Sequence, residues 1–530
     1  MSDSEWTKKW TELAAEVRSV DQLDASKTIT HSDSAAILRN IVRSNLLRFT
    51  DVQRNPLRFF EAHRILAARA PALGPGFWIR FTVQYNLFAG SIAALGDAEQ
   101  LDALDAMQAR GTLGCFALTE KLAGVNSGMV ANTTAVYDTE STTFSISTPT
   151  QGAHKNWISQ GFVADSAVVV ASLTDGTGAK CGPTAFVVEL RDEASGALAP
   201  GVTVTDMGGK TVGNDLDNVA LAFDNVTVPR SAMLSRYASV DSEGRCAPTA
   251  AGTGVSAFAM VGQRLFTGRV AVAQAALTFS RELFAETRRY SDAKACWPKG
   301  ALSDVPQLRS LYTEAGKRFN ALDALVAKCE GDLAEALLAD TVPSADLVEA
   351  IAVCKVSAIR SVSRTLQRPA CVDRFVSRTR APDRSADMRG TFRSRMHCVL
   401  RFTPRDPNDA QVRAVEEAIE LCFRLKQEVG SYALMSGTAF EQLDFLQCCK
   451  FAEGDSRILM LKMGRDAMRS YAKHGRVGGA GAAADDEAER LCAEIAAASE
   501  AGTSEEDGEW EKIFCLAEMT MARVSKRVCP

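Results

Sequence analysis

The stretch GCFALTEKLAGVNSGMVANTTAVYD, residues 114–138, marks the point at which the chain changes from helical to strand patterns. Its last part, TTAVYD, alternates apolar and polar side chains, and TFSIST at residues 143–148 does the same after a short polar loop. Alternation with a period of two is typical of half-buried strands, so the two segments predict a β-hairpin. Short β-branched runs that predict further buried strands follow at residues 167–173, 184–190 and 218–229.

Helical patterns flank this region on both sides. Upstream, apolar residues recur at i, i+3 and i+4 between residues 5 and 110, with Ser32 and Asp97 as predicted N-caps. Downstream, four long amphipathic segments lie at residues 265–290, 303–330, 344–367 and 409–434. Four such helices in succession favour a bundle. The low-complexity stretch GRVGGAGAAADDEAER, residues 475–490, predicts a linker, and the tail beyond it predicts one last helix.

The order of these patterns predicts an α+β fold of several domains. A chain of 530 residues is longer than a single core usually holds. We predict an N-terminal helical domain over residues 1–112 and a middle β domain over residues 113–248. A C-terminal helical bundle follows over residues 249–475, and a linker with a short helical tail over residues 476–530.

Composition excludes several classes of function. Net charge is −5 and acids and bases are spread along the chain, which argues against a nucleic-acid surface or a polybasic membrane anchor. The 14 cysteines form no CxxC pairs and the 5 histidines do not cluster with them, so no metal site is predicted. We expect reduced thiols in an intracellular protein without a signal peptide, and no apolar run is long enough to span a membrane.

Five short motifs follow one another along this helix–β–helix plan. They are FALTEKLAGVNSG at residues 116–128, KNWISQG at 155–161, DNVALAFDNVTVPRSAMLSRY at 217–237, RRY at 288–290 and FAEGDSRI at 451–458. The series resembles the acyl-CoA dehydrogenase and acyl-CoA oxidase superfamily over roughly residues 80–475. The segment LFAGSIAALGDAEQLDAL, residues 87–104, is more similar to the oxidase branch. The resemblance implies a middle β-barrel domain between an N-terminal helical domain and a C-terminal four-helix bundle.

The resemblance also implies FAD as the cofactor. In this family the residue matching Thr119 bonds the pyrimidine edge of the flavin, where an uncharged hydroxyl can both donate and accept. The residue matching Trp157 packs near the flavin, and the one matching Ser159 donates toward flavin N5, where charge arrives with the hydride. Taken alone, each is an ordinary strand residue, and only the order of the motifs favours the cofactor role.

A glycine-rich turn in the same family faces the FAD pyrophosphate, because glycine lets the backbone N–H groups approach an anion closely. The matching candidates in this chain are Gly124, Ser127 and Gly128. Relative to the family pattern the turn has one extra residue, which leaves the choice between Asn126 and Ser127 open.

Four further residues match positions that reach the FAD of a partner subunit, which implies a homodimer with a shared cofactor site. Arg288 matches an arginine that binds the pyrophosphate, since guanidinium and phosphate geometries agree. The other three are Gln307, Gln427 and Gly430. Within QEVGSYA, residues 427–433, Ser431 and Ala433 replace glycines of the family, and their side chains would crowd a close ligand.

The pair Glu453–Gly454 matches the catalytic base of the family. There the carboxylate removes the α-proton of an acyl thioester while the β-hydrogen leaves as hydride to flavin N5. The chemistry needs a carboxylate shielded from water, whose pKa is thereby raised. The base's own N–H polarises the thioester oxygen in relatives, and we assign Gly454 to the substrate site for this reason. Without the other motifs, Glu453 would be a surface residue in a first helical turn.

The resemblance implies an FAD-dependent acyl-CoA oxidase of fatty-acid β-oxidation. Such an enzyme converts acyl-CoA to trans-2-enoyl-CoA and passes electrons to O2, giving H2O2. Three alternatives remain open: a dehydrogenase that uses an electron-transfer flavoprotein, a non-catalytic binding or assembly protein on the same scaffold, and another flavin chemistry such as monooxygenation. Relatives of the oxidase kind are peroxisomal, although the terminal KRVCP does not match a Ser-Lys-Leu signal.

Overall fold

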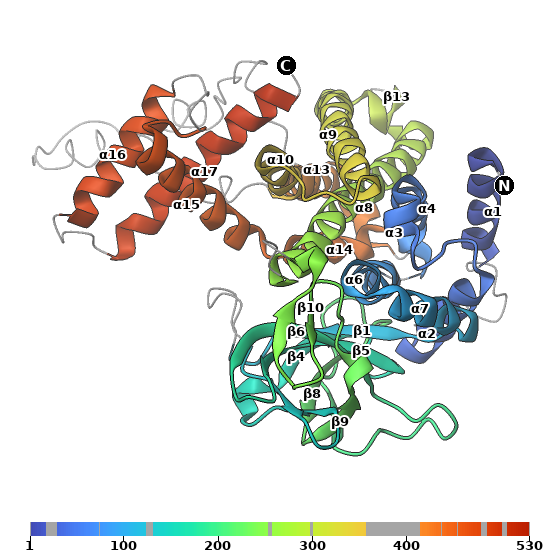
Figure 1. Cartoon of the computed structure of the whole chain (residues 1–530). Coiled ribbons are helices and arrows are strands. Elements are labelled where there is room, and N and C mark those ends of the chain that lie inside the picture. Colours follow the sequence, from blue (N-terminus) through green and yellow to red (C-terminus); the bar gives the residue numbers. More distant parts are fainter. Residues whose placement is uncertain are drawn as a thin grey trace, which may run out of the picture.

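The protein is described from a computed structural model, in which a β region lies at one end of the molecule and helices cover it (Figure 1). The structure describes residues 2–16, 29–73, 75–122, 131–252, 257–296, 300–356, 414–435, 437–452, 454–478, 485–500 and 506–528. The long helix α8 (Ala257–Ala293) runs through the centre, and α15–α17 form a lobe on the side away from the N-terminal helices.

The N-terminal helices are α1 (Asp3–Glu16), α2 (His31–Ser44), α3 (Asp51–Arg54), α4 (Pro56–Leu73), α5 (Pro75–Thr82), a π-helical segment (Val83–Ala89), α6 (Gly90–Leu95) and α7 (Ala98–Arg110). Asp97 caps α7, as predicted, in a reciprocal box with Gln100. The prediction for Ser32 is wrong, because α2 is capped by Thr30. Asp33 lies three residues after Thr30, and its carboxylate accepts a hydrogen bond from the Thr30 N–H while its own N–H donates to the Thr30 hydroxyl. Ser32 could not form this reciprocal pair, because the residue three positions after it is Ala35.

The β region contains two sheets with one core between them. The larger sheet has the order β1-β5-β2-β3-β9, with β6 paired to β5, and the smaller has the order β4-β8-β7. Phe144 and Ile146 of the first sheet and Leu221 and Phe223 of the second are buried in the same cluster. The strands are β1 (Gly114–Ala117), β2 (Thr134–Asp138), β3 (Thr143–Ser147), β4 (Lys155–Ser159), β5 (Ser166–Thr174), β6 (Lys180–Glu189), β7 (Val202–Asp206), β8 (Asn218–Phe223) and β9 (Val226–Pro229).

Two strand predictions had different outcomes. The hairpin is confirmed, because β2 and β3 pair antiparallel with Tyr137 opposite Phe144. The run at residues 218–229 is not a single strand, since β8 and β9 belong to different sheets. Asn225 between them has a φ of 50°, a left-handed conformation that asparagine tolerates better than most residues, and the chain turns there. Two short pairs complete the strands: β10 (Ala238–Val240) with β11 (Cys246–Pro248), and β12 (Ala295–Cys296) with β13 (Gly300–Ala301).

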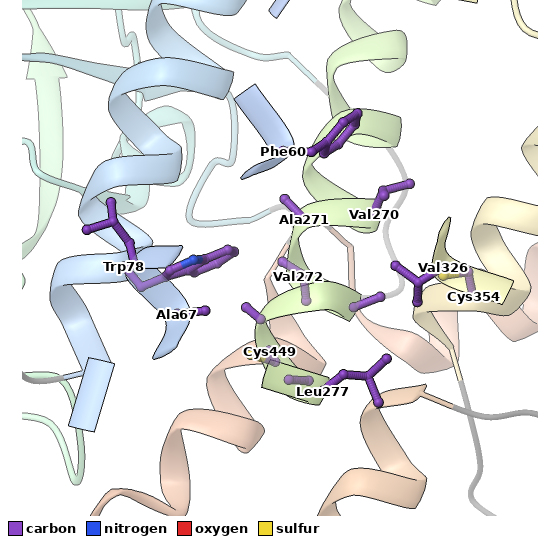
Figure 2. Packing of buried hydrophobic residues seen from close by; sticks show 14 of the residues in the cluster. Phe60, Ala67, Trp78, Val270, Ala271, Val272, Leu277, Val326, Cys354 and Cys449 are labelled. Atoms are coloured by element: carbon purple, nitrogen blue, oxygen red, sulfur yellow. The ribbon is translucent and has the colours of Figure 1, made fainter. Parts of the chain in front are cut away.

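Helix α8 is the centre of the helical core. It is accompanied by α9 (Pro306–Leu338), α10 (Ala345–Lys355), α13 (Ala414–Val429), α14 (Asp444–Phe451) and α15 (Ser456–His474). All four amphipathic segments contain a helix, although residues 357–367 and 409–413 lie outside the described ranges. Figure 2 shows the small side chains Val270, Ala271 and Val272 of α8 with Phe60, Ala67, Trp78, Val326, Cys354 and Cys449 from the surrounding helices. Residues 267–277 of α8 are all buried, so neighbouring elements cover this part of the helix on every side.

The C-terminal tail forms more structure than the sequence predicted. Residues 486–490 of the predicted linker begin a helix, α16 (Asp486–Glu500), whose acidic first turn suits the positive end of the helix dipole. The predicted last helix is α17 (Glu506–Val528), which packs on α15 and joins the main core through residues such as Met521. Arg523 of α17 pairs with Glu349 of α10 at 3.3 Å. The domain limits at residues 112, 248 and 475 stay a prediction.

Among the helices of the described ranges, none is long and apolar enough to cross a membrane.

His63 in α4 should make the helical core sensitive to acid. Its ring is buried against Phe59 and Phe81, its Nδ1 is bonded to the Phe59 carbonyl at 2.7 Å, and burial lowers its pKa to about 4. The unfolded chain takes up this proton near pH 6.5 and the folded chain does not. Stability should therefore be unaffected above pH 6.5 and should fall by about 1.4 kcal/mol per pH unit between pH 6.5 and 4.

Urea unfolding of the wild type and of His63→Leu at several pH values measures this effect. The His63→Leu variant lacks the titrating ring, so its unfolding midpoint should fall less steeply below pH 6.5. Parallel pH profiles for the two proteins would show that His63 is not the group responsible.

Candidate functional site

Thr119 and Trp157 lie side by side where the two sheets meet. The Asn156 N–H donates to the Thr119 carbonyl at 2.8 Å, and Glu120 and Lys155 form an isolated antiparallel bridge next to it. Thr119 is exposed at the end of β1, and its hydroxyl is therefore accessible beside the start of β4. The structure thus brings together two of the residues that the motifs predicted to contact one ligand.

The indole of Trp157 is turned out of the sheet by an irregularity in β4. The register between β4 and β8 shifts between Lys155 and Ile158, and Trp157 has a φ of 58°. As a result its side chain is 58% exposed, whereas Ile158 beside it is buried. Ser159, at the end of the strand, accepts a hydrogen bond from Asn218 Nδ2 at 3.0 Å. An exposed aromatic plane next to two hydroxyl groups is a surface on which a flat, partly polar ligand can stack.

Glu120 and Lys155 form a buried ion pair next to this edge, and the sequence did not predict it. Lys155 Nζ lies 3.0 Å from Glu120 Oε1, and both side chains are fully buried. Lys155 also donates to the carbonyls of Leu118 and Val170 at 3.2 and 2.7 Å, so it connects β1, β4 and β5. The only available signal was proximity to predicted site residues: Glu120 directly follows Thr119, and Lys155 lies two residues before Trp157.

Burial disfavours the charged form of both residues of this pair, and their neighbours oppose this effect. Burial lowers the pKa of Lys155 to about 8, although the neighbouring Glu120 opposes this shift. Burial acts to raise the pKa of Glu120, but the Thr133 N–H at 2.9 Å, the Asn132 N–H and the Lys155 charge together hold it below its ordinary value. Glu120 is therefore ionised at neutral pH, and its partners compensate the charge.

A second group of predicted residues lies around the C-terminal end of α8. Arg288 binds Asp292 through Nε at 2.9 Å, and its guanidinium lies over the Tyr312 ring at 4.8 Å. Close by, Tyr290 stacks on Tyr432 of the turn Gly430–Leu434 with ring centroids 3.6 Å apart. The structure thus brings Arg288 near the turn that holds Gly430. Gln307 is exposed in the first turn of α9, and Gln427 is exposed in the last turn of α13.

The substitutions in QEVGSYA leave room at the glycine that remains. Gly430 has a φ of 59°, and a Cβ placed on it would meet no atom within 4 Å. Ser431 is exposed and Ala433 is buried, so only one of the two substituted side chains faces solvent. A ligand can therefore still approach the backbone at Gly430.

The two groups of residues lie at opposite sides of one chain. Figure 1 shows β4 within the β region, whereas β13, which follows the end of α8, lies at the far end of the helices. The two groups of residues therefore lie far apart within one chain.

Several predicted residues lie outside the described residues, and their placement stays a prediction. They are Gly124, Ser127 and Gly128 of the glycine-rich turn, together with Asn126, and the candidate base Glu453.

The backbone on both sides of position 453 is described and is tightly held. Gly454 has a φ of 97°, which disfavours any other residue, and a Cβ there would lie 3.5 Å from Arg269 Nη2. Asp455 is buried and caps α15 by accepting from the Arg457 N–H at 2.8 Å. Lys355, fully buried at the end of α10, donates to the Lys450 carbonyl at 2.9 Å and to the Gly454 carbonyl.

No metal centre competes with this site in the part of the chain that the structure describes. There, no three or more His, Cys, Asp or Glu side chains are grouped closely enough to hold a metal ion.

Comparisons of sequence with known proteins point to one group of enzymes. No family model matches the chain. Acyl-coenzyme A oxidase 3 of Yarrowia lipolytica is 40% identical over 178 residues, which are 32% of this chain and 25% of that protein. Acyl-coenzyme A oxidase 2, peroxisomal, of Arabidopsis thaliana is 35% identical over 204 residues, or 37% of this chain and 29% of that protein. The matched stretch thus spans little more than a quarter of each relative.

Solved structures agree over nearly the whole fold. The acyl-CoA oxidase-2 structure from Caenorhabditis elegans, bound with FAD, ascaroside-CoA and ATP, matches with a TM-score of 0.66 at 19% identity, covering 98% of this chain and 75% of that one. Butyryl-CoA dehydrogenase from Megasphaera elsdenii matches with a TM-score of 0.58 at 17% identity, covering 87% of this chain and 97% of that one. This chain therefore has the fold of these acyl-CoA oxidase and dehydrogenase structures, and over about a third of its length its sequence is similar to acyl-coenzyme A oxidases.

Proposed function

We propose that the protein is an FAD-dependent acyl-CoA oxidase that forms trans-2-enoyl-CoA and passes electrons to O2, giving H2O2. The observation that carries the proposal is the edge formed by Thr119 and the exposed Trp157 on this fold. The sequence relatives support it because they are named acyl-coenzyme A oxidases, and one structural neighbour is bound with FAD, ascaroside-CoA and ATP.

The residues present fit a flavin dinucleotide. Trp157 offers an exposed plane for a flat ring, Thr119 is exposed beside the start of β4, and Ser159 ends that strand. Neutral hydroxyl groups can bond a ring system that has both donors and acceptors without adding charge. We assign these three residues to the flavin end of the cofactor, with Gly124, Ser127 and Gly128 near its pyrophosphate.

The second group, around Arg288 and Gly430, supports a homodimer. Figure 1 shows β4, the strand that carries Trp157, in the β region, and β13, which follows the end of α8, at the far end of the helices. In a dimer, Arg288, Gln307, Gln427 and Gly430 of one subunit would serve the cofactor of the other. The Arg288 guanidinium suits a phosphate because it presents several N–H donors in one plane.

In the proposed reaction Glu453 takes up a proton from the carbon next to the thioester carbonyl. FAD, when bound, accepts the hydride from the adjacent carbon. The chain must keep the Glu453 carboxyl away from water, because a shielded carboxylate is a stronger base. Gly454 allows the backbone at this turn to adopt a φ of 97° beside the substrate.

Aerobic turnover tests the choice of electron acceptor. FAD-loaded protein should consume medium- or long-chain acyl-CoA and release one H2O2 per enoyl-CoA formed. Efficient reduction of an artificial electron-acceptor dye with little H2O2 would favour a dehydrogenase that uses an electron-transfer flavoprotein. A colourless protein that cannot be reconstituted with FAD would favour a binding or assembly role. By analogy with the Arabidopsis relative, we propose the peroxisome as its compartment.

A further inference from the structure

Lys355 joins the two sides of the turn between α14 and α15. It is the last residue of α10, and its side chain is fully buried, as are Ile351 and Val353 of the same helix. Its Nζ donates to the Lys450 carbonyl at 2.9 Å and also to the Gly454 carbonyl. Burying an ammonium group is costly unless hydrogen bonds compensate it, so its presence in this core requires a reason.

Capping of α14 explains only half of this arrangement. Lys450 lies in the last turn of α14, where carbonyl groups lack helical partners and a cation is favourable. Gly454, however, lies beyond the end of that helix, and a bond to its carbonyl contributes nothing to the cap. Ser456 Oγ also lies 3.5 Å from the Lys450 carbonyl, which adds a second connection across the same turn.

We propose that Lys355 is a positioning residue for the candidate base Glu453, an inference that rests on the proposed function. Lys450 and Gly454 bracket position 453, and Glu453 is covalently bonded to Gly454. Fixing both carbonyls restrains the described backbone on either side of position 453. A displacement of about 1 Å at a reacting group can cost about 100-fold in rate. Lys355 would therefore govern the rate of proton removal and leave substrate binding to other residues.

The test compares Lys355→Met, which keeps the length of the side chain and removes its donors, with the wild type. In FAD-loaded protein, the rate of anaerobic flavin reduction by acyl-CoA should fall by about 10- to 100-fold. The Kd for acyl-CoA should stay within a factor of about three, since the turn's binding surface is retained. In FAD-free protein, backbone amides of residues 450–458 should exchange with deuterium faster, a readout independent of turnover.

Gln108→Leu is a matched control. Gln108 is also buried, and its Nε2 donates to two backbone carbonyls, those of Val42 and Leu47, at 3.3 and 2.8 Å. This control should lower the melting temperature without changing the reduction rate. Because Lys355 acts through Glu453, adding Lys355→Met to Glu453→Gln should slow the residual reduction no further.

The outcomes separate this inference from the proposed function. A wild type that acyl-CoA does not reduce refutes both. If the wild type is reduced and Lys355→Met is reduced equally fast, the positioning role alone is overturned. The same holds if Lys355→Met lowers the reduction rate of Glu453→Gln by the same factor as that of the wild type. It also holds if Gln108→Leu lowers the reduction rate as much as Lys355→Met does. If Lys355→Met does not fold, Lys355→Arg takes its place, because it keeps the cation and moves the donors. It should show a loss of about 10-fold at unchanged Kd, and a wild-type rate for it refutes the inference.

Discussion

Replacing Glu453 by Gln should slow the reduction of bound FAD by acyl-CoA by at least about 100-fold while substrate binding persists. The amide has nearly the shape of the carboxylate but cannot accept a proton from the substrate carbon. General-base catalysis by a positioned side chain is typically worth about 100- to 10,000-fold, and we expect a rate loss of at least this size. Stopped-flow absorbance under anaerobic conditions measures the reduction rate, and the spectral shift on ligand addition measures the Kd.

A neighbouring glutamate provides the control for this variant. Glu441 is exposed and accepts a hydrogen bond from the Gly437 N–H at 2.7 Å, so it lies in a nearby part of the chain and has a structural contact of its own. Glu441→Gln should retain the wild-type reduction rate. If Glu453→Gln reduces flavin as fast as the wild type, another residue is the base and the assignment from the motif is wrong.

Lys155→Met should strongly destabilise the β region. The substitution leaves the ionised Glu120 buried without its cation and also removes the donors to the carbonyls of Leu118 and Val170. Removing one partner of a buried ion pair typically costs about 3–5 kcal/mol, because an uncompensated charge stays in the interior. Urea unfolding followed by tryptophan fluorescence, together with the FAD dissociation constant, measures the effect on the fold and on the edge that carries Trp157.

Two further variants identify the cause of this loss. The double variant Lys155→Met/Glu120→Gln carries no charge at these two positions and keeps an acceptor for the Thr133 N–H, so it should recover part of the lost stability. Lys328→Met removes an exposed pair with Asp332 at 3.0 Å and should leave the melting temperature nearly unchanged. A Lys155→Met protein as stable as the wild type would show that the ion pair does not support the site.

Much of the fold could be predicted because it depends on local periodicity. The β2–β3 hairpin follows from the alternation in TTAVYD and TFSIST, and α8 and α9 follow from long helical patterns. The wrong predictions concern where helices begin, because a few neighbouring residues determine which residue caps a helix and whether a helix starts. Thr30 displaces Ser32 as a cap because Asp33 completes its box, and the acidic residues from Asp486 onward start a helix inside an apparent linker.

The candidate site was only partly predictable for a different reason. The motifs indicated Thr119, Trp157 and Arg288, because matching residues occur in order along the chain. The outward turn of Trp157 depends on a backbone irregularity that no residue in KNWISQG indicates. Lys155 and Lys355 escaped prediction because their partners are distant in sequence: Glu120 lies 35 residues from Lys155, and the Gly454 carbonyl lies 99 residues from Lys355. A buried cation is recognised only once its acceptors are placed around it.

An anaerobic absorbance titration of the FAD-loaded protein with medium- and long-chain acyl-CoA tests the central claim most directly. The account predicts that the oxidised-flavin absorbance disappears as acyl-CoA is added, that enoyl-CoA forms in equal amount, and that air restores the colour with release of H2O2. A protein that holds FAD but keeps its full absorbance with every acyl-CoA chain length would contradict the account.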